Sequence, residues 1–196
     1  MKVVRQTDVP RYGDYKKYKP LLRKDFLYRC AYCQHHERTI GQVAAMSVDH
    51  FRPKSLFPNL RVEYTNLYYC CGECNTYKGN KWPGPEQRDA GECFVDVCVD
   101  EWDEHLEIRS DVMTGITSIG RFTAEQVRLN RRKLTVRNRT LSTHLAKIRG
   151  DLARVDGIRR RLRTGINAET ARDLDELEHG LQADLRALLF PEPLED

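Results

Sequence analysis

The chain has 196 residues and a net charge of +4, with 40% hydrophobic and 32% charged residues, which suits one domain of ordinary size plus an appendage. The longest stretch without Asp, Glu, Lys or Arg is the ten residues 39–48, and a membrane-spanning helix needs about 18 or more apolar residues, so membrane insertion is excluded. The N-terminal residues contain no apolar run of signal-peptide length, and we therefore expect a cytoplasmic protein. Its seven cysteines are then reduced, which favours metal binding over disulfides.

The charge changes sign along the chain in four blocks. Residues 1–80 carry a net +7, residues 81–120 a net −7, residues 121–163 a net +11, and residues 164–196 a net −7. A mild basic excess permits a nucleic-acid partner without requiring one.

The first half of the chain is expected to contain short elements. Residues 1–19 form an irregular lead-in, and Pro20 can start a short helix. Residues 83–104 are expected to form an acidic loop with early prolines. Residues 105–121 predict two short strands around a turn at Met113–Gly115.

The second half is expected to be a helical region, residues 122–196, after a first domain of residues 1–121. Thr123 to Gln126 fits a capping box, and two apolar stripes follow at helical spacing. A break at Thr164–Gly165 separates them, Asn167 can cap the second helix, and Pro191 and Pro193 end it. The stripes comprise Leu141, Leu145, Ile148, Leu152, Val155 and Leu162, then Ala171, Leu174, Leu177, Leu181, Leu185 and Leu188.

The opposite charges of these two helices allow two interpretations. Either the helices form an antiparallel hairpin whose polar flanks partly neutralise each other, or the basic face binds DNA or docks another protein.

Two Cys-x2-Cys pairs, Cys30 with Cys33 and Cys71 with Cys74, supply four thiolates, the ligand set of a tetrahedral zinc ion. The 37 residues between the pairs exceed the usual spacing of about 15–20, so the metal would join the two ends of an insertion. Cys70 could replace Cys71 with an x3 spacing, but the matching x2 spacing favours Cys71. Cys70, Cys93 and Cys98 are then expected to pack.

The insertion carries polar side chains in a distinctive order. Asp49 and His50 come at the expected end of a strand after Met46 and Val48, Asn66 lies before the second cysteine pair, and Asn75 follows it. Adjacent strand residues point to opposite faces, so Asp49 and His50 can share a site only where the strand bends or ends. Each residue taken singly is a weak signal, and the order is what carries the interpretation.

This ordered set, residues 30–81, resembles the HNH or ββα-metal endonucleases in the version framed by a four-cysteine zinc site. The surrounding VDHFRPKS and EYTNLYYCCGECNTYKGNKWP are similar to the HNH proteins of Septu and retron-associated antiphage systems. The resemblance implies an α+β fold with a ββα-metal core and a structural zinc site, followed by the C-terminal helical hairpin.

The resemblance also implies roles for the polar residues. His50 would be the general base, Asp49 and Asn75 would hold one catalytic Mg²⁺ or Mn²⁺, and Asn66 would brace the loop that carries His50. An imidazole with a pKa near ~6.5 can accept a proton at neutral pH, and oxygen ligands favour hard ions. Four flanking cations are available to phosphates: Arg52, Lys54, Lys78 and Lys81.

The sequence therefore predicts a metal-dependent nuclease that hydrolyses DNA, acting in antiphage defence with an ATPase partner. The alternative is a catalytically silent, zinc-stabilised module that binds nucleic acid or a protein partner.

Overall fold

A computed structural model describes residues 2–162 and 167–189 of the chain. The chain forms two compact units, Met1–Thr135 and Val136–Asp196. Among the described residues, none of the helices is both long and apolar enough to cross a membrane.

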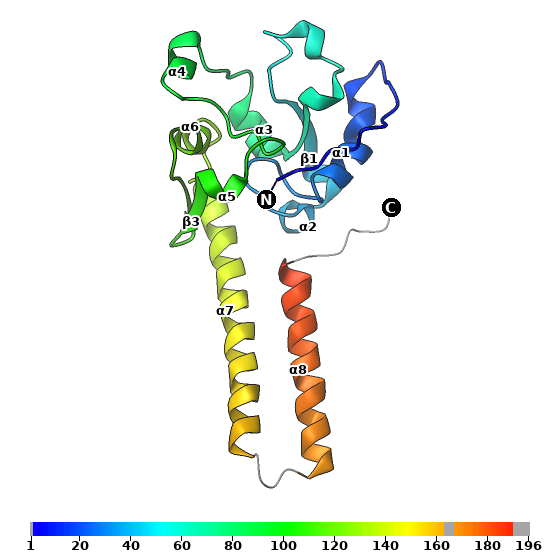
Figure 1. Ribbon diagram of the computed structural model, residues 1–196, viewed down its shortest axis with the longest axis vertical. Helices are drawn as coiled ribbons and strands as arrows, with labels where there is room; N and C mark the ends of the chain where they lie inside the picture. The colour runs from blue at the N-terminus through cyan, green and yellow to red at the C-terminus, as the bar shows by residue number, and fades with distance from the viewer. Residues whose placement is uncertain (1, 163–166, 190–196) are drawn as a thin grey trace. The chain divides into compact units, whose positions relative to one another are not determined.

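The first unit contains two small antiparallel sheets and short helices (Figure 1). One sheet pairs β1 (Met46–His50) with β2 (Leu67–Cys71), in a register that sets Met46 opposite Cys71 and His50 opposite Leu67. Helix α3 (Gly72–Lys78) follows β2 directly. This β–β–α succession confirms the expected mixed fold, and it places the end of β1 near α3. The other elements of the unit are α1 (Lys19–Asp25), α2 (Glu37–Ile40), α4 (Pro85–Asp89), α5 (Trp102–His105), β3 (Leu106–Arg109), β4 (Val112–Gly115) and α6 (Ser118–Gln126).

The N-terminal residues pack against this core. The Val3 amide donates to the Val97 carbonyl at 2.6 Å, and the Arg5 guanidinium donates to the carbonyls of Tyr64 and Leu67 at 3.0 and 2.8 Å. Pro20 lies in the first turn of α1, as expected of a proline that starts a helix. The irregular lead-in is thus attached to the segment that enters β2.

A buried ion pair joins the first helices to β2. The Arg23 guanidinium contacts both carboxylate oxygens of Glu37, the closest contact being 2.8 Å, and the Tyr69 hydroxyl donates to the same carboxylate at 2.5 Å. Glu37 is fully buried. Because a buried charge requires a partner, this contact holds the segment after the first cysteine pair against the sheet.

The turn of the second hairpin was expected at Met113–Gly115, and this expectation is wrong. Strands β3 and β4 pair with Leu106 opposite Gly115, and the turn lies at Ser110–Asp111, where φ is +48° and +66°. Met113 is buried within β4. Gly115 does not form the turn. It allows α6 to pack closely against β4, because a Cβ at this position would lie 2.1 Å from the Arg121 amide nitrogen of α6.

The expected capping box at Thr123 is also wrong. Helix α6 begins at Ser118, and its cap is Thr117, whose hydroxyl accepts from the Gly120 amide at 3.2 Å. Thr123 lies inside α6, where its buried hydroxyl accepts from the Val95 amide at 2.8 Å. Phe122, Val127, Leu129 and Leu134 are buried with the first unit's core. The division therefore falls after Thr135 and not after residue 121.

The second unit is a helical hairpin of α7 (Arg132–Arg161), which begins just before the division, and α8 (Ala168–Leu189). The Asn167 carboxamide accepts from the Thr170 amide at 2.8 Å, which confirms the expected cap of α8. Arg159 of α7 pairs with Asp175 and Glu178 of α8, at 2.5 and 2.8 Å. Farther along, residues around Ile148 and Asp184 line one groove, so the helices are antiparallel. The expected break at Thr164–Gly165 and stop at Pro191 and Pro193 lie outside the described residues.

Candidate functional site

Four cysteines converge in the first unit. The sulfur atoms of Cys30, Cys33, Cys71 and Cys74 lie within 4.8 Å of one another, and all four residues are buried. Tetrahedral zinc with bonds of about 2.3 Å would place its sulfurs about 3.8 Å apart, so the cluster fits such an ion. Cys71 belongs to the cluster, as its x2 spacing predicted, and Cys70 does not.

The electrostatics of the cluster favour a bound cation. Burial raises the pKa of the Cys30 thiol well above its ordinary value, while hydrogen bonds with the other thiols raise the pKa of Cys33 and lower that of Cys71. Four crowded thiols cannot all ionise unaided, because each thiolate opposes the next. A divalent ion compensates these charges, which supports a metal in this position.

Arg131 approaches the cluster from the segment before α7. Its Nη2 donates to Cys74 Sγ at 3.3 Å, and its Nε pairs with Glu73 at 3.4 Å. Arg131 and Arg128 both lie over the Tyr77 ring, at 5.3 and 5.2 Å from its centroid. Arg131 thus gives the buried cysteine cluster a positive neighbour, whereas Arg128 contacts the Tyr77 ring.

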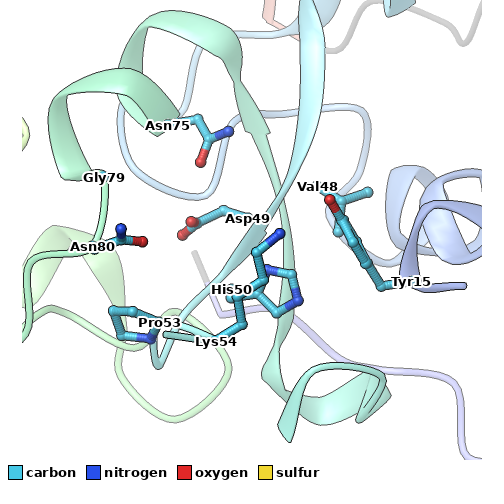
Figure 2. A pocket seen from close by; sticks show the side chains of 9 residues that line it. All are labelled: Tyr15, Val48, Asp49, His50, Pro53, Lys54, Asn75, Gly79 and Asn80. Carbon is cyan, nitrogen blue, oxygen red and sulfur yellow. The ribbon is translucent and has the colours of Figure 1, made fainter. Parts of the chain in front are cut away.

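A second, polar site opens at the end of β1 (Figure 2). Asp49 and His50, the last two residues of β1, both line a cavity of about 240 Å³ with Asn75 of α3. The strand ends at His50, so the two adjacent side chains reach one cavity. Figure 2 shows the Asp49 carboxylate between the side chains of Asn75 and Asn80, with His50 beside Tyr15 and Lys54.

Asp49 is buried and held from two sides. Its Oδ2 accepts from the Tyr32 hydroxyl at 2.5 Å and lies 3.1 Å from Lys78 Nζ. Burial raises the pKa of Asp49, and the Lys78 ammonium opposes that rise. The carboxylate therefore has a fixed orientation and a buried cationic neighbour.

Lys78 does not lie at the surface, where the sequence led us to expect a phosphate contact. Its side chain is fully buried, and Nζ also donates to the His50 carbonyl at 2.8 Å. A buried ammonium needs such partners. The expected direct contact with nucleic acid is therefore wrong for Lys78, which instead connects α3 to the end of β1.

His50 has one nitrogen engaged. Its Nε2 lies 2.9 Å from the Arg61 carbonyl oxygen, and a carbonyl can only accept, so Nε2 carries the hydrogen and Nδ1 has a lone pair. Burial lowers the pKa of His50, against the opposing effect of this hydrogen bond. The Tyr15 ring meets the imidazole edge-on, with centroids 4.6 Å apart. The imidazole is thus neutral and oriented.

The asparagines take different positions. Asn66 lies outside the cavity, where its Oδ1 accepts from the Arg52 amide at 2.9 Å and its Nδ2 donates to the Arg52 carbonyl at 3.0 Å. These contacts brace the loop that follows His50. Asn75 and Asn80 line the cavity, so they present amide groups beside Asp49.

The remaining cations expected at the site are exposed. Lys54 lines the cavity and lies over the Tyr15 ring at 4.9 Å. Arg52 lies over the rings of Phe57 and Trp82, and Lys81 donates to the Gln126 carbonyl at 2.9 Å. Of these three, Lys54 is the one that lines the cavity.

Four residues that contact the cysteine cluster or belong to the polar site were not identified from the sequence. Tyr15 precedes the first cysteine pair, and Tyr32 lies between its two cysteines. No spacing rule links either tyrosine to His50 or Asp49. Arg131 lies 57 residues from Cys74, so only the fold brings it there. Asn80 had a usable signal, because it follows Gly79 at the end of α3, where φ is +52° and the chain turns back.

The cysteine cluster and the residues Asp49, His50 and Asn75 lie in a part of the chain that matches a known protein family. Residues 30–81 match the HNH endonuclease family. The Septu protein PtuB of Bacillus thuringiensis is 29% identical over 102 residues, covering 52% of this chain and 37% of that protein. The chain therefore matches well under half the length of this relative. No solved structure matches the chain.

Replacing Arg131 tests its contact with the cysteine cluster. We expect Arg131→Gln to weaken Zn²⁺ binding by about tenfold, because partners of metal ligands typically contribute that much to affinity. Competition with a chromogenic chelator measures this affinity. Arg128→Gln removes the other Tyr77 contact as a control and should leave zinc affinity unchanged; equal affinities in the two variants would contradict the role of Arg131.

Proposed function

We propose that the protein, whose residues 30–81 match the HNH endonuclease family, is a metal-dependent nuclease that hydrolyses DNA phosphodiester bonds. The observation that carries the proposal is the single cavity shared by Asp49, His50 and Asn75. Around one cavity, the imidazole can accept a proton from the attacking water, and the carboxylate and amide oxygens can hold a divalent ion.

His50 is the proposed general base. With Nε2 donating to the Arg61 carbonyl, Nδ1 is left to take a proton from the attacking water. The water oxygen forms a bond to phosphorus while the bond from phosphorus to the leaving oxygen breaks. The lowered pKa of His50 keeps the imidazole neutral and ready to accept this proton.

Asp49 and Asn75 are the proposed ligands of a catalytic Mg²⁺ or Mn²⁺, with Asn80 close by. Carboxylate and amide oxygens suit hard cations, and the cavity between these side chains supplies polar surroundings. When bound, such an ion stabilises negative charge on the phosphate and the leaving oxygen. Asp49 is oriented toward this task by Tyr32 and Lys78.

Zn²⁺ is the proposed structural metal of Cys30, Cys33, Cys71 and Cys74. Their close approach and burial, and the cost of crowding four thiols without a cation, support this assignment. Zinc would hold the first cysteine pair to the junction of β2 and α3, from which Asn75 projects.

The other residues have supporting roles in this proposal. Asn66 is a positioning residue, since it bonds to the backbone of Arg52 two residues after His50. Exposed Lys54 is placed to contact a phosphate at the cavity, and Arg52 and Lys81 to contact the flanking backbone.

We place this activity in antiphage defence in the cytoplasm, together with an ATPase partner. The similarity to Septu protein PtuB supports the defence setting. A silent binding module is the second candidate. The intact set of Asp49, His50 and Asn75 in one cavity favours the enzyme, because a module without catalysis has no need of a free imidazole lone pair there.

His50→Ala tests the proposed reaction. We expect the variant to retain its fold and lose at least about 100-fold in plasmid cleavage with Mg²⁺ or Mn²⁺, the usual contribution of a general base. The matched control is His179→Ala, an exposed histidine of α8, which should cut as the parent protein does. Cleavage that persists in His50→Ala would assign the base elsewhere, and a parent protein that cuts neither alone nor with its ATPase partner would favour the silent module.

Lys78→Met tests whether Asp49 binds the divalent ion. Without the ammonium, the buried carboxylate has lost its positive neighbour, so we expect unfolding free energy to fall by about 3 kcal/mol without Mg²⁺. Added Mg²⁺ should then raise the melting temperature of this variant more than that of the parent, because the ion replaces the missing charge.

Two further variants keep this test decisive. Lys81→Met removes an exposed lysine and should respond to Mg²⁺ as the parent does. Asp49→Asn combined with Lys78→Met should remove the extra Mg²⁺ response. An identical response with and without Asp49 would show that the ion binds elsewhere.

A further inference from the structure

The helical hairpin has a groove along one face, between α7 and α8, which run side by side (Figure 1). The groove has a volume of about 520 Å³, and its apolar lining comprises Ile148 of α7 with Leu181, Ala187 and Leu188 of α8. We infer that two copies of the chain associate through this groove, so that their hairpins form one four-helix bundle. This assembly goes beyond the proposed nuclease activity and does not depend on it.

The two helices leave most of their apolar side chains incompletely covered. Among the twelve residues of the two apolar stripes, Val155 and Leu174 are buried, and the other ten are half-buried or exposed. Two helices alone cover one side of each stripe, whereas a four-helix bundle encloses such residues between facing helices. The second unit therefore presents apolar surface that a second hairpin would cover.

Exposed apolar side chains continue the groove toward the end of α7 and the start of α8. Steps of seven or eleven residues return to nearly the same side of an α-helix. Ile158 and Leu162 follow the groove residue Asp151 by seven and eleven residues. Leu177 precedes the groove residue Asp184 by seven. The groove and these three apolar residues, which are 42%, 39% and 52% exposed, are called here the groove face.

The two flanks of the groove face carry opposite charges. On α7, Lys147 lines the groove, and two arginines follow it at steps of seven residues. On α8, Asp184 lines the groove, and one acidic residue precedes each of Asp184 and Ala187 by eleven residues. The α7 flank thus comprises Lys147, Arg154 and Arg161, and the α8 flank comprises Asp173, Glu176 and Asp184, all of them exposed.

Contacts within one copy neutralise these flanks only in part. Asp151 pairs with Arg154 and also lines the groove near Lys147. On the other helix, Arg172 lies 3.9 Å from Glu176. With Asp151 and Arg172 counted, the α7 flank keeps a net charge of +2 and the α8 flank a net charge of −2. Because pairs between exposed groups contribute little free energy, they are readily exchanged for contacts with a second copy.

A second copy of the hairpin matches this arrangement of charges. A two-fold axis parallel to the helices places α7 of each copy over α8 of the other, running antiparallel to it. Each basic flank then faces an acidic flank, on both sides of the interface. A nucleic acid would be repelled by the α8 flank, and a protein of one charge sign would match only one flank. The self-complementary pattern therefore selects a second copy as the occupant.

The groove face is large enough for a specific interface. The 22 residues of α8 extend about 33 Å, and two helices side by side are about 20 Å wide. The resulting footprint of roughly 660 Å² per copy approaches the roughly 800 Å² per partner of a standard interface. We therefore expect a dimer that dissociates on dilution.

Sedimentation velocity of the full chain, at about 0.5–50 µM, measures the association, since this range covers the dissociation constants expected of such an interface. The groove variant carries Ile158→Gln and Leu177→Gln. The matched control carries Ile108→Gln and Ile116→Gln, two isoleucines of the first unit that are 51% and 45% exposed. We expect the parent and the control to reach the mass of two chains, and the groove variant to associate at least about 100-fold more weakly, because its apolar contacts are lost.

A pair of charge reversals tests whether the occupant is a second copy. One variant carries Arg154→Glu and Arg161→Glu, and the other carries Asp173→Lys and Glu176→Lys. Alone, each variant sets like charges opposite each other, so we expect its association to weaken at least about tenfold. In an equimolar mixture the flanks are again complementary on both sides, and association should return to within about threefold of the parent. This recovery also shows that both variants are folded.

Three results would overturn the inference. The first is a parent that keeps the mass of one chain at every concentration, including one that binds its ATPase partner through the groove. The second is a dimer that the groove variant and the control affect equally, which would place the contact elsewhere. The third is a mixture of the two charge variants that associates no better than either variant alone. Cleavage of plasmid is not part of these measurements, so their outcome is separate from that of the proposed nuclease.

Discussion

The convergence of four thiols is the constraint on which the first unit depends. Cys30 and Cys33 follow α1, while Cys71 ends β2 and Cys74 lies in the first turn of α3. An ion bound by all four sulfurs would therefore join an early turn to the junction of strand and helix. Because Cys71 pairs with Met46 across the sheet, holding Cys71 also holds the register of β1. That register decides where Asp49 and His50 emerge, and α3 carries Asn75 toward them. The cysteine cluster thus helps to position the polar site, although none of its four residues lines that cavity.

The polar site depends in turn on a buried ion pair. Lys78 comes from the last turn of α3 and contacts both the Asp49 carboxylate and the His50 carbonyl. Such a pair contributes little net stability, but losing one partner is costly. Its value here is geometric, since it fixes the distance between α3 and the end of β1. His50 is fixed separately, by the Arg61 carbonyl on one side and the Tyr15 ring on another. Carboxylate and imidazole therefore keep their orientations before any ligand binds.

Motif spacing predicted the local parts of this arrangement and failed where burial decides. The two cysteine pairs, the strand that ends at His50 and the Asn167 cap were predictable, because each depends on residues near one another in the chain. Lys78 was not, since a lysine beside a site is usually exposed and only the packing of α3 onto β1 buries it. From the sequence, the hairpin turn was placed at Gly115, because glycine is common in turns. Gly115 instead allows the close packing of α6 against β4. Thr123 resembled a helix cap, yet its hydroxyl bonds to the distant Val95. Long-range contacts of this kind leave no periodic signal.

The most direct measurement of the central claim is the zinc content of the purified chain and two neighbouring variants, determined by inductively coupled plasma mass spectrometry. Cys71 belongs to the thiol cluster and Cys70, its immediate neighbour, does not. The account predicts one zinc per chain, retained in Cys70→Ser and lost in Cys71→Ser, with a lower melting temperature in the latter. A folded chain without zinc, or a loss that follows Cys70 in place of Cys71, would contradict it.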